Sequence, residues 1–105
     1  MAVQLESRFN KAMWNIYRKA YSEANYKASR FLQMLENHGG LETAKILIHS
    51  PTVSEGYTAL WERGRLDLTV EALIHDNPEW HPMFTKDELE IVSKRLSDYK
   101  YNLAQ

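Results

Sequence analysis

Histidines and neighbouring carboxylates are the residues in this 105-residue chain that could support metal or acid–base chemistry. The densest group is His75, Asp76, Glu79 and His81, and imidazole with carboxylate is a ligand set that zinc and iron accept. Two ligands on one helix must lie three or four residues apart to face the same ion. Pro78 interrupts that register, because a proline cannot continue a helix interior. We therefore predict no metal site, and a small metal-dependent hydrolase is the third hypothesis for this chain.

The other two histidines, His38 and His49, lie at predicted helix ends, where a cation is favourable. The chain has no cysteine, which excludes disulfides, thiolate metal ligands and cysteine nucleophiles. It also has no glycine-rich phosphate loop and no serine nucleophile motif. We predict a protein that is not an enzyme and that uses no cofactor.

The most distinctive segment, residues 60–71, places arginines and acids around a predicted turn between helices. Arginine forms bidentate pairs with carboxylates, so an arginine–acid pair within the segment could lock the turn. Alternatively, an arginine beside the tryptophan points outward and anchors a partner. The predicted partner-binding residues are Trp61, Arg63, Arg65, Asp67 and Glu71.

The net charge of −1 conceals an uneven distribution. Residues 1–40 hold six basic and three acidic side chains, whereas residues 41–105 hold seven basic and eleven acidic ones. Either the two parts pack together and their fields cancel, or the basic part faces an anionic partner. Single-strand binders place aromatic rings beside cations, as the first predicted helix does. Nucleic acid is therefore the alternative partner, although a negative net charge opposes it. Its predicted binding face is Arg8, Lys11, Trp14, Arg18, Lys19 and Tyr21.

Apolar residues recur at helical spacing along nearly the whole chain. We therefore expect helices to position the side chains described above. The first and longest predicted helix covers residues 3–23, and Asn25-Tyr26 can break it before the next helix. Its predicted inner face is Leu5, Phe9, Ala12, Met13, Ile16, Ala20 and Ala24.

Helix start and stop signals divide the rest of the chain into shorter helices. In chain order they are Gly39-Gly40, Ser50-Pro51, Ser54, Gly64, Asp67 or Thr69, and Asp76-Asn77-Pro78. Residues 78–82 predict a turn or one short helical turn, and Thr85 with Glu88 predicts a capping box for the last helix. No segment shows the sustained alternation of apolar and polar residues that is typical of a β-strand. The predicted fold is therefore all-α: one domain over residues 1–105, a compact bundle of six or seven helices without a sheet.

No apolar run approaches the roughly 18 residues that cross a bilayer. The opening residues, MAVQLESRFNK, lack the apolar stretch of a secretory signal. We therefore expect a cytoplasmic protein without a membrane partner.

Several motifs extend over most of residues 9–101. They are Gly39-Gly40-Leu41 with Ala44-Lys45, Ser54-Glu55-Gly56-Tyr57, the block LWERGRLDLTVEAL at 60–73, Pro78-Glu79-Trp80, and Phe84-Thr85 before Glu88-Leu89. Together they resemble a family of small bacterial all-helical domains with no assigned activity. The resemblance implies an autonomous bacterial domain but supplies no mechanism. Asn25 departs from the pattern, which has glycine before the tyrosine, so the sequence leaves open whether the first two helices are separate or continuous.

The leading hypothesis is a non-enzymatic protein–protein interaction module of a bacterial cytoplasmic accessory system. Three tryptophans and six tyrosines in 105 residues also favour exposed aromatic surface, so self-association is a further expectation.

Overall fold

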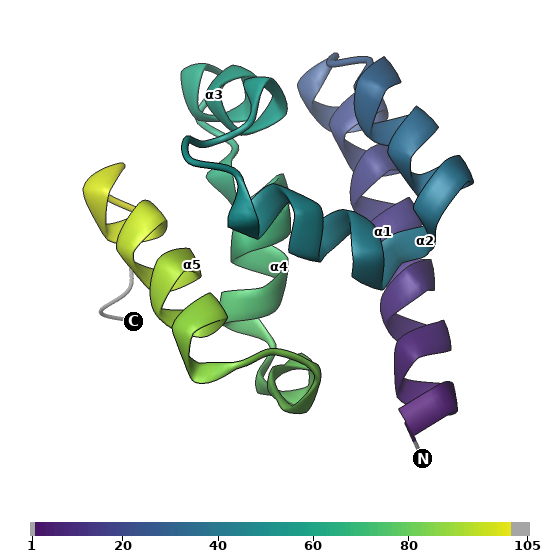
Figure 1. Cartoon of the computed structure of the whole chain (residues 1–105). Coiled ribbons are helices and arrows are strands. Elements are labelled where there is room, and N and C mark those ends of the chain that lie inside the picture. Colours follow the sequence, from purple (N-terminus) through teal and green to yellow (C-terminus); the bar gives the residue numbers. More distant parts are fainter. Residues whose placement is uncertain (1, 102–105) are drawn as a thin grey trace.

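The computed structural model describes residues 2–101, with side chains from residue 4 onward, as five α-helices and two 3₁₀ helices (Figure 1). They are α1 (Ala2–Ala24), α2 (Ser29–His49), α3 (Glu55–Glu62), η1 (Leu66–Leu68), α4 (Val70–Asp76), η2 (Pro78–Met83) and α5 (Lys86–Asp98). No strand occurs among the described residues, and α1 is the longest helix. The predicted all-α bundle is confirmed.

The first two helices are separate, which answers a question that the Asn25-Tyr26 sequence leaves open. Asn25 adopts the left-handed backbone conformation with φ of 53°. The amide of Tyr26 then donates to the carbonyl of Ala20 at 2.9 Å, which satisfies one of the free carbonyls at the end of α1. The chain reverses direction within a few residues, so the first part of α2 lies against α1.

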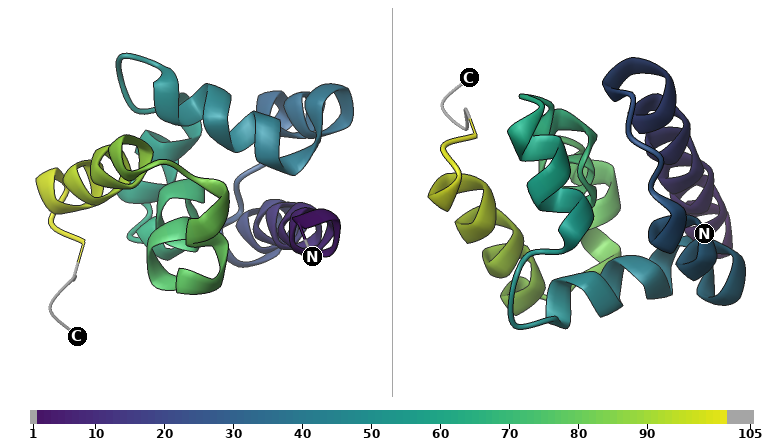
Figure 2. Two further views of the ribbon diagram at one scale, coloured as in Figure 1. Left: turned by 60° about the horizontal axis from the view of Figure 1, so that its bottom comes forward. Right: turned by 90° about the horizontal axis from the view of Figure 1, so that it is seen from above.

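The Gly39-Gly40 pair bends α2 into two arms instead of separating two helices. Gly39 has φ of 79° and ψ of 173°, a conformation that strains any residue with a side chain. Residues 29–38 form the first arm beside α1, and residues 41–49 form the second arm, which crosses towards α5 (Figure 2). The position of the predicted stop is right, but the helix resumes in a new direction at once.

Gly40 is required at the bend because the backbones of α1 and α2 meet there. A Cβ atom at residue 40 would lie 2.9 Å from the Cα of Asn10, which is closer than real Cβ contacts. The amide of Gly40 also donates to the Asn10 side-chain oxygen at 2.7 Å. We expect Gly40→Ala to lower the free energy of unfolding by about 2 kcal/mol, since two helices must move apart.

Urea denaturation of Gly40→Ala and of Gly56→Ala would check this expectation. Gly56 lies within α3, and a Cβ atom there would meet its nearest neighbours at an ordinary 3.8 Å. Gly56→Ala should therefore raise stability by about 0.5–1 kcal/mol, through helix propensity. Equal effects of the two alanines would contradict the close approach at Gly40.

The predicted helix starts in the second half of the chain are largely confirmed. The hydroxyl of Ser54 accepts from the amide of Tyr57, and Thr85 with Glu88 forms the complete capping box. Of the two predicted starts for α4, Thr69 is the N-cap, whereas Asp67 lies in η1.

The inner face of α1 is fixed to the rest of the bundle at two places. Near its start, Phe9 packs edge-on against Trp80 at 5.3 Å and Phe84 at 5.7 Å between ring centroids. Near its end, Ala20 packs with Leu60 and Leu68 in a second cluster. These contacts fix α1 to η2 near its start and to α3 and η1 near its end.

Candidate functional site

Arg65 joins the end of α1 to η1. Its guanidinium binds the Glu23 carboxylate at 2.8 Å and the Asp67 carboxylate at 3.0 Å. The predicted pair between Arg65 and Asp67 is therefore present. Glu23, which the sequence did not suggest, lies 42 residues away and brings α1 into the same contact.

Arg63 also binds the end of α1. It donates to the carbonyls of Ala24 at 3.1 Å and Ala59 at 2.9 Å, and its guanidinium lies 5.0 Å from the centre of the Tyr26 ring. Cations are favourable at a helix C-terminus, where carbonyls lack partners. Both arginines of residues 60–71 therefore act within the chain as a clasp on α1, not as outward anchors.

Glu71 is not part of a partner-binding surface, which corrects the sequence-based prediction. Its side chain is buried, with 3% of the residue exposed, and its carboxylate accepts from Arg95 at 3.0 Å. Burial raises the pKa of Glu71, and the bond from Arg95 opposes that rise. Arg95 comes from α5, 24 residues further on, so no local pattern indicated this pair.

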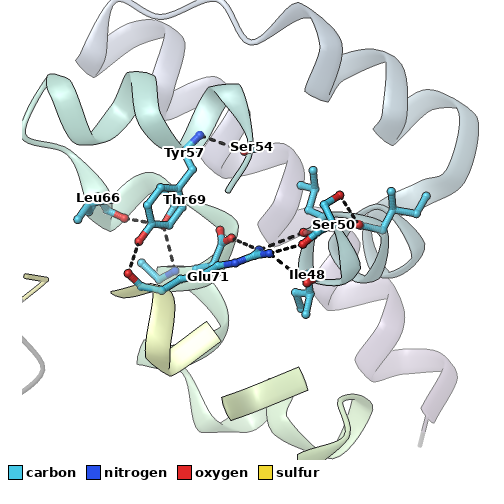
Figure 3. Close-up of polar contacts among 11 residues, drawn as sticks. Ile48, Ser50, Ser54, Tyr57, Leu66, Thr69 and Glu71 are labelled. Carbon is cyan, nitrogen blue, oxygen red and sulfur yellow. Dashed lines mark hydrogen bonds and ion pairs between the residues drawn. The ribbon is translucent and has the colours of Figure 1, made fainter. Parts of the chain in front are cut away.

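Arg95 also completes the C-terminal end of α2. It donates to the carbonyls of Leu47 at 3.0 Å, Ile48 at 3.2 Å and Ser50 at 2.6 Å. Figure 3 shows these bonds converging on one guanidinium, with Glu71 on the opposite side. One arginine thus connects α2, α4 and α5.

Trp61 is the predicted partner-binding residue that offers a large free surface. It is 46% exposed, and it packs edge-on against Tyr99 with ring centroids 5.3 Å apart. The Tyr99 ring packs in turn on buried Tyr57 at 4.9 Å. Trp61 therefore extends the core to the surface at one side of α3.

A groove lies between the α1–α2 pair and the layer of α3, η1 and α4, with a volume of about 690 Å³. We call it the elbow groove, because both arms of the bent α2 contribute to its wall. Its other walls come from α1, from the loop after α2, and from the first residues of α3 and α4. The apolar side chains that line it most openly are Tyr17, Phe31, Met34, Ile46, Leu47 and Val53.

Charged side chains stand at the edge of the elbow groove. Lys27 and Arg30 come from the segment that starts α2, and Glu55 comes from the start of α3; all three are exposed. None of the ion pairs among the described residues includes them. No local sequence pattern predicts this groove, because the bend at Gly39 brings together apolar residues that a helical wheel assigns to two separate helices.

Glu88 is the centre of a second polar cluster, between α2 and α5. Its carboxylate binds Lys45 at 2.9 Å, His49 at 2.7 Å and the amide of Thr85 at 2.8 Å. Burial by itself would raise the pKa of Glu88, but the bonds from Lys45, Thr85 and His49 outweigh it and lower the pKa to about 2. His49 therefore has a carboxylate partner that its position at a helix end did not suggest.

The histidine and carboxylate group at residues 75–81 does not converge on one point. His81 hydrogen-bonds the carbonyl of Ile74, and Asp76 accepts from Tyr101. Within the part of the chain that the structure describes, no three histidine or acidic side chains are placed to hold a metal ion. Three of the four side chains, those of Asp76, Glu79 and His81, are thus used in separate contacts.

The predicted nucleic-acid face on α1 is only partly free. Arg8 pairs with Glu79 and lies 5.6 Å from the centre of the Trp80 ring, so it joins α1 to η2. The other members, apart from half-buried Trp14, are exposed: Lys11, Arg18, Lys19 and Tyr21. Arg8 is therefore better assigned to the fold than to the face.

Comparison of the chain with protein-family profiles, curated proteins and solved structures finds no match. Among the described residues, no helix is both long enough and apolar enough to cross a bilayer. We therefore infer function from the geometry of the chain itself.

Proposed function

We propose that this chain is a non-enzymatic protein-interaction module that binds an acidic, amphipathic segment of a partner in the elbow groove. The observation that supports this proposal is an apolar groove with two unpaired cations, Lys27 and Arg30, at its edge. A groove of this kind accepts a helix through residues spaced by three and four, and the cations select acidic residues beside them.

The polar groups inside the groove favour binding over catalysis. The Tyr57 hydroxyl donates to the carbonyl of Arg95 at 3.0 Å, and the Thr69 hydroxyl donates to the carbonyl of Leu66 at 2.7 Å. The Glu71 carboxylate accepts a hydrogen bond from Arg95 at 3.0 Å. These groups are occupied by bonds that hold the fold, so they are poor candidates for acid–base work on a ligand.

A bacterial cytoplasmic setting, in an accessory system, belongs to the same proposal. The absence of cysteine is consistent with a reducing compartment. The same proposal includes self-association, in which a second copy of the chain would cover exposed apolar side chains. Ile46 at the groove is 39% exposed, and Trp61 on α3 is 46% exposed.

Selection from a library of random fifteen-residue peptides on the immobilised chain tests the proposal. We expect enrichment of peptides with apolar residues at spacings of three and four and with acidic residues beside them. Fluorescence anisotropy of a labelled selected peptide then measures affinity. Gly56→Leu, which directs a branched side chain into the groove beside Tyr26, should weaken binding at least tenfold.

Gly56→Ala is the matched control, because it changes the same residue and leaves the groove open. It should bind the peptide as the wild type does. The double variant Lys27→Glu with Arg30→Glu should bind acidic peptides several-fold more weakly. Its thermal midpoint of unfolding should be unchanged. Peptides that bind Gly56→Leu as tightly as the wild type would overturn the elbow groove as the binding site. A concentration-dependent dimer in light scattering that Gly56→Leu abolishes would instead identify a second copy as the occupant and overturn the acidic partner segment.

A further inference from the structure

We infer that the outward face of α1 binds single-stranded nucleic acid, with cations on the phosphates and aromatic rings on the bases. This inference is independent of the elbow groove, because it concerns the opposite side of the same helix. Ile16 and Ala20 point from α1 towards the groove, whereas Lys11 and Arg18 are exposed on the other side.

The face consists of a basic residue followed three positions later by an aromatic one, and this unit occurs twice. The first unit is Lys11 with Trp14, and the second is Arg18 with Tyr21. The units are seven residues apart, which is nearly two turns and about 10.5 Å along the helix. Both cations therefore lie in one row and both rings in a parallel row, displaced by about 60° around the helix axis.

The spacing of the rings matches a nucleotide strand. Bases stack about 3.4 Å apart, so a separation of about 10.5 Å places the two rings three base steps from each other. The row of cations runs beside them at the same separation and can follow the phosphates. Lys11, Trp14, Asn15 and Arg18 also line a shallow hollow on the surface of α1.

The electrostatics of the face are more favourable than the net charge suggests. None of the ion pairs among the described residues includes Lys11, Arg18 or Lys19. The exposed acids of α1 are Glu6 and Glu23. Glu6 lies five positions before Lys11, and Glu23 lies five positions after Arg18, so each acid is turned by about 140° around the helix axis from the cation nearest to it in sequence. Glu23 is in addition paired with Arg65. The negative charge of the chain therefore lies mostly elsewhere.

The aromatic row favours a single strand over a duplex. Tyr21 is 56% exposed, the largest value among the large hydrophobic side chains of the described residues. Trp14 is half-buried and held edge-on by Tyr17, with 6.3 Å between ring centroids. Stacking on these rings requires an unpaired base, because the faces of the bases in a duplex are already stacked on neighbouring base pairs.

Fluorescence anisotropy with a labelled twelve-nucleotide thymidine strand and with a duplex of the same length tests the inference. The wild type should bind the single strand at 50 mM salt and more weakly at 200 mM salt, and it should bind the duplex less tightly. Lys11→Glu with Arg18→Glu should lose at least tenfold in affinity. The slope of log affinity against log salt should fall by about 1.4, since two phosphate contacts are removed.

The matched control is Lys86→Glu with Lys94→Glu, which changes the net charge by the same amount on exposed residues of α5. It should bind nearly as the wild type does. Tyr21→Ala should bind the single strand about tenfold more weakly than the wild type does. Tyr21→Phe should bind it as tightly as the wild type, because phenylalanine keeps the aromatic ring. Circular dichroism should show unchanged thermal midpoints for all four variants.

Several results would overturn the inference. They are a wild type that binds no strand at 50 mM salt, a control that loses as much affinity as Lys11→Glu with Arg18→Glu, and a duplex that binds as tightly as the strand while Tyr21→Ala has no effect. The peptide selected on the elbow groove should bind Lys11→Glu with Arg18→Glu normally, so failure of one proposal is distinguishable from failure of the other.

Discussion

Arg95→Met is expected to lower the free energy of unfolding by about 3–5 kcal/mol, the largest effect of any substitution considered for this chain. The change removes the charge that faces the Glu71 carboxylate at 3.0 Å and leaves that carboxylate buried without a countercharge. It also removes the hydrogen bonds from Arg95 to three carbonyls at the end of α2. Urea denaturation followed by circular dichroism measures the loss.

Glu71→Gln should cost less than Arg95→Met, because the arginine keeps its bonds to three carbonyls. We expect about 1–2 kcal/mol for it. The double variant should be more stable than Arg95→Met alone, since it contains no unpaired buried charge. If the double variant lost the sum of the two single effects, the pair would not be coupled.

The pH dependence of Arg95→Met provides a signature that lost packing would not give. Burial already raises the pKa of Glu71, and removal of Arg95 raises it further. A carboxyl with a raised pKa in the folded state binds protons that the unfolded chain does not bind in the same pH range. The variant should therefore regain stability relative to the wild type as pH falls from neutral towards 5. The double variant, which lacks the carboxyl, should not.

Local signals explain why the fold could be predicted from the sequence. Ser54, Thr69 and Thr85 cap helices through bonds to amides three residues on, and Gly39 and Gly64 take left-handed conformations at helix bends and ends. Each of these devices depends on residues within one turn of each other. A linear sequence contains that information.

The candidate sites depended on contacts between distant segments. Arg65 binds Asp67 two residues away, as predicted, but it also binds Glu23, 42 residues earlier. The sequence groups Glu71 with the arginines and acids of residues 60–71, whereas its side chain is buried and binds Arg95 of α5. The elbow groove exists only because α2 bends at Gly39. No pattern within a single helix shows that the apolar residues of the two arms face each other.

The bent α2 also explains how a chain of 105 residues could offer two separate binding surfaces. One arm of α2 supports α1, so the inner side of α1 closes the elbow groove and its outer side stays exposed. Two arginine contacts, from Arg63 and Arg65, fix the end of α1 to the rest of the bundle. The outer face of α1 belongs to a single helix, and most of the residues that line the elbow groove also come from helices, which favours a preorganised binding module.

Glu88→Gln is expected to remove about 3 kcal/mol of stability at neutral pH and very little in acid. The pKa of Glu88 in the folded chain is lowered to about 2 from an ordinary value of 4.5. A lowered carboxyl pKa stabilises the fold above the unfolded value, and this stabilisation is lost as pH falls towards the folded value. The difference in unfolding free energy between the wild type and Glu88→Gln should therefore shrink between about pH 4.5 and pH 2.

Urea denaturation at pH 7 and near pH 3 measures that difference, and Glu90→Gln is the matched control. Glu90 lies on the same helix, is exposed and has no ion pair among the described residues, so its effect should be small at both pH values. Lys45→Met should reproduce part of the Glu88→Gln behaviour, because Lys45 provides a bond that lowers the pKa. An equal loss for Glu88→Gln at both pH values would mean that packing or the helix cap, and not the charge of Glu88, joins α2 to α5.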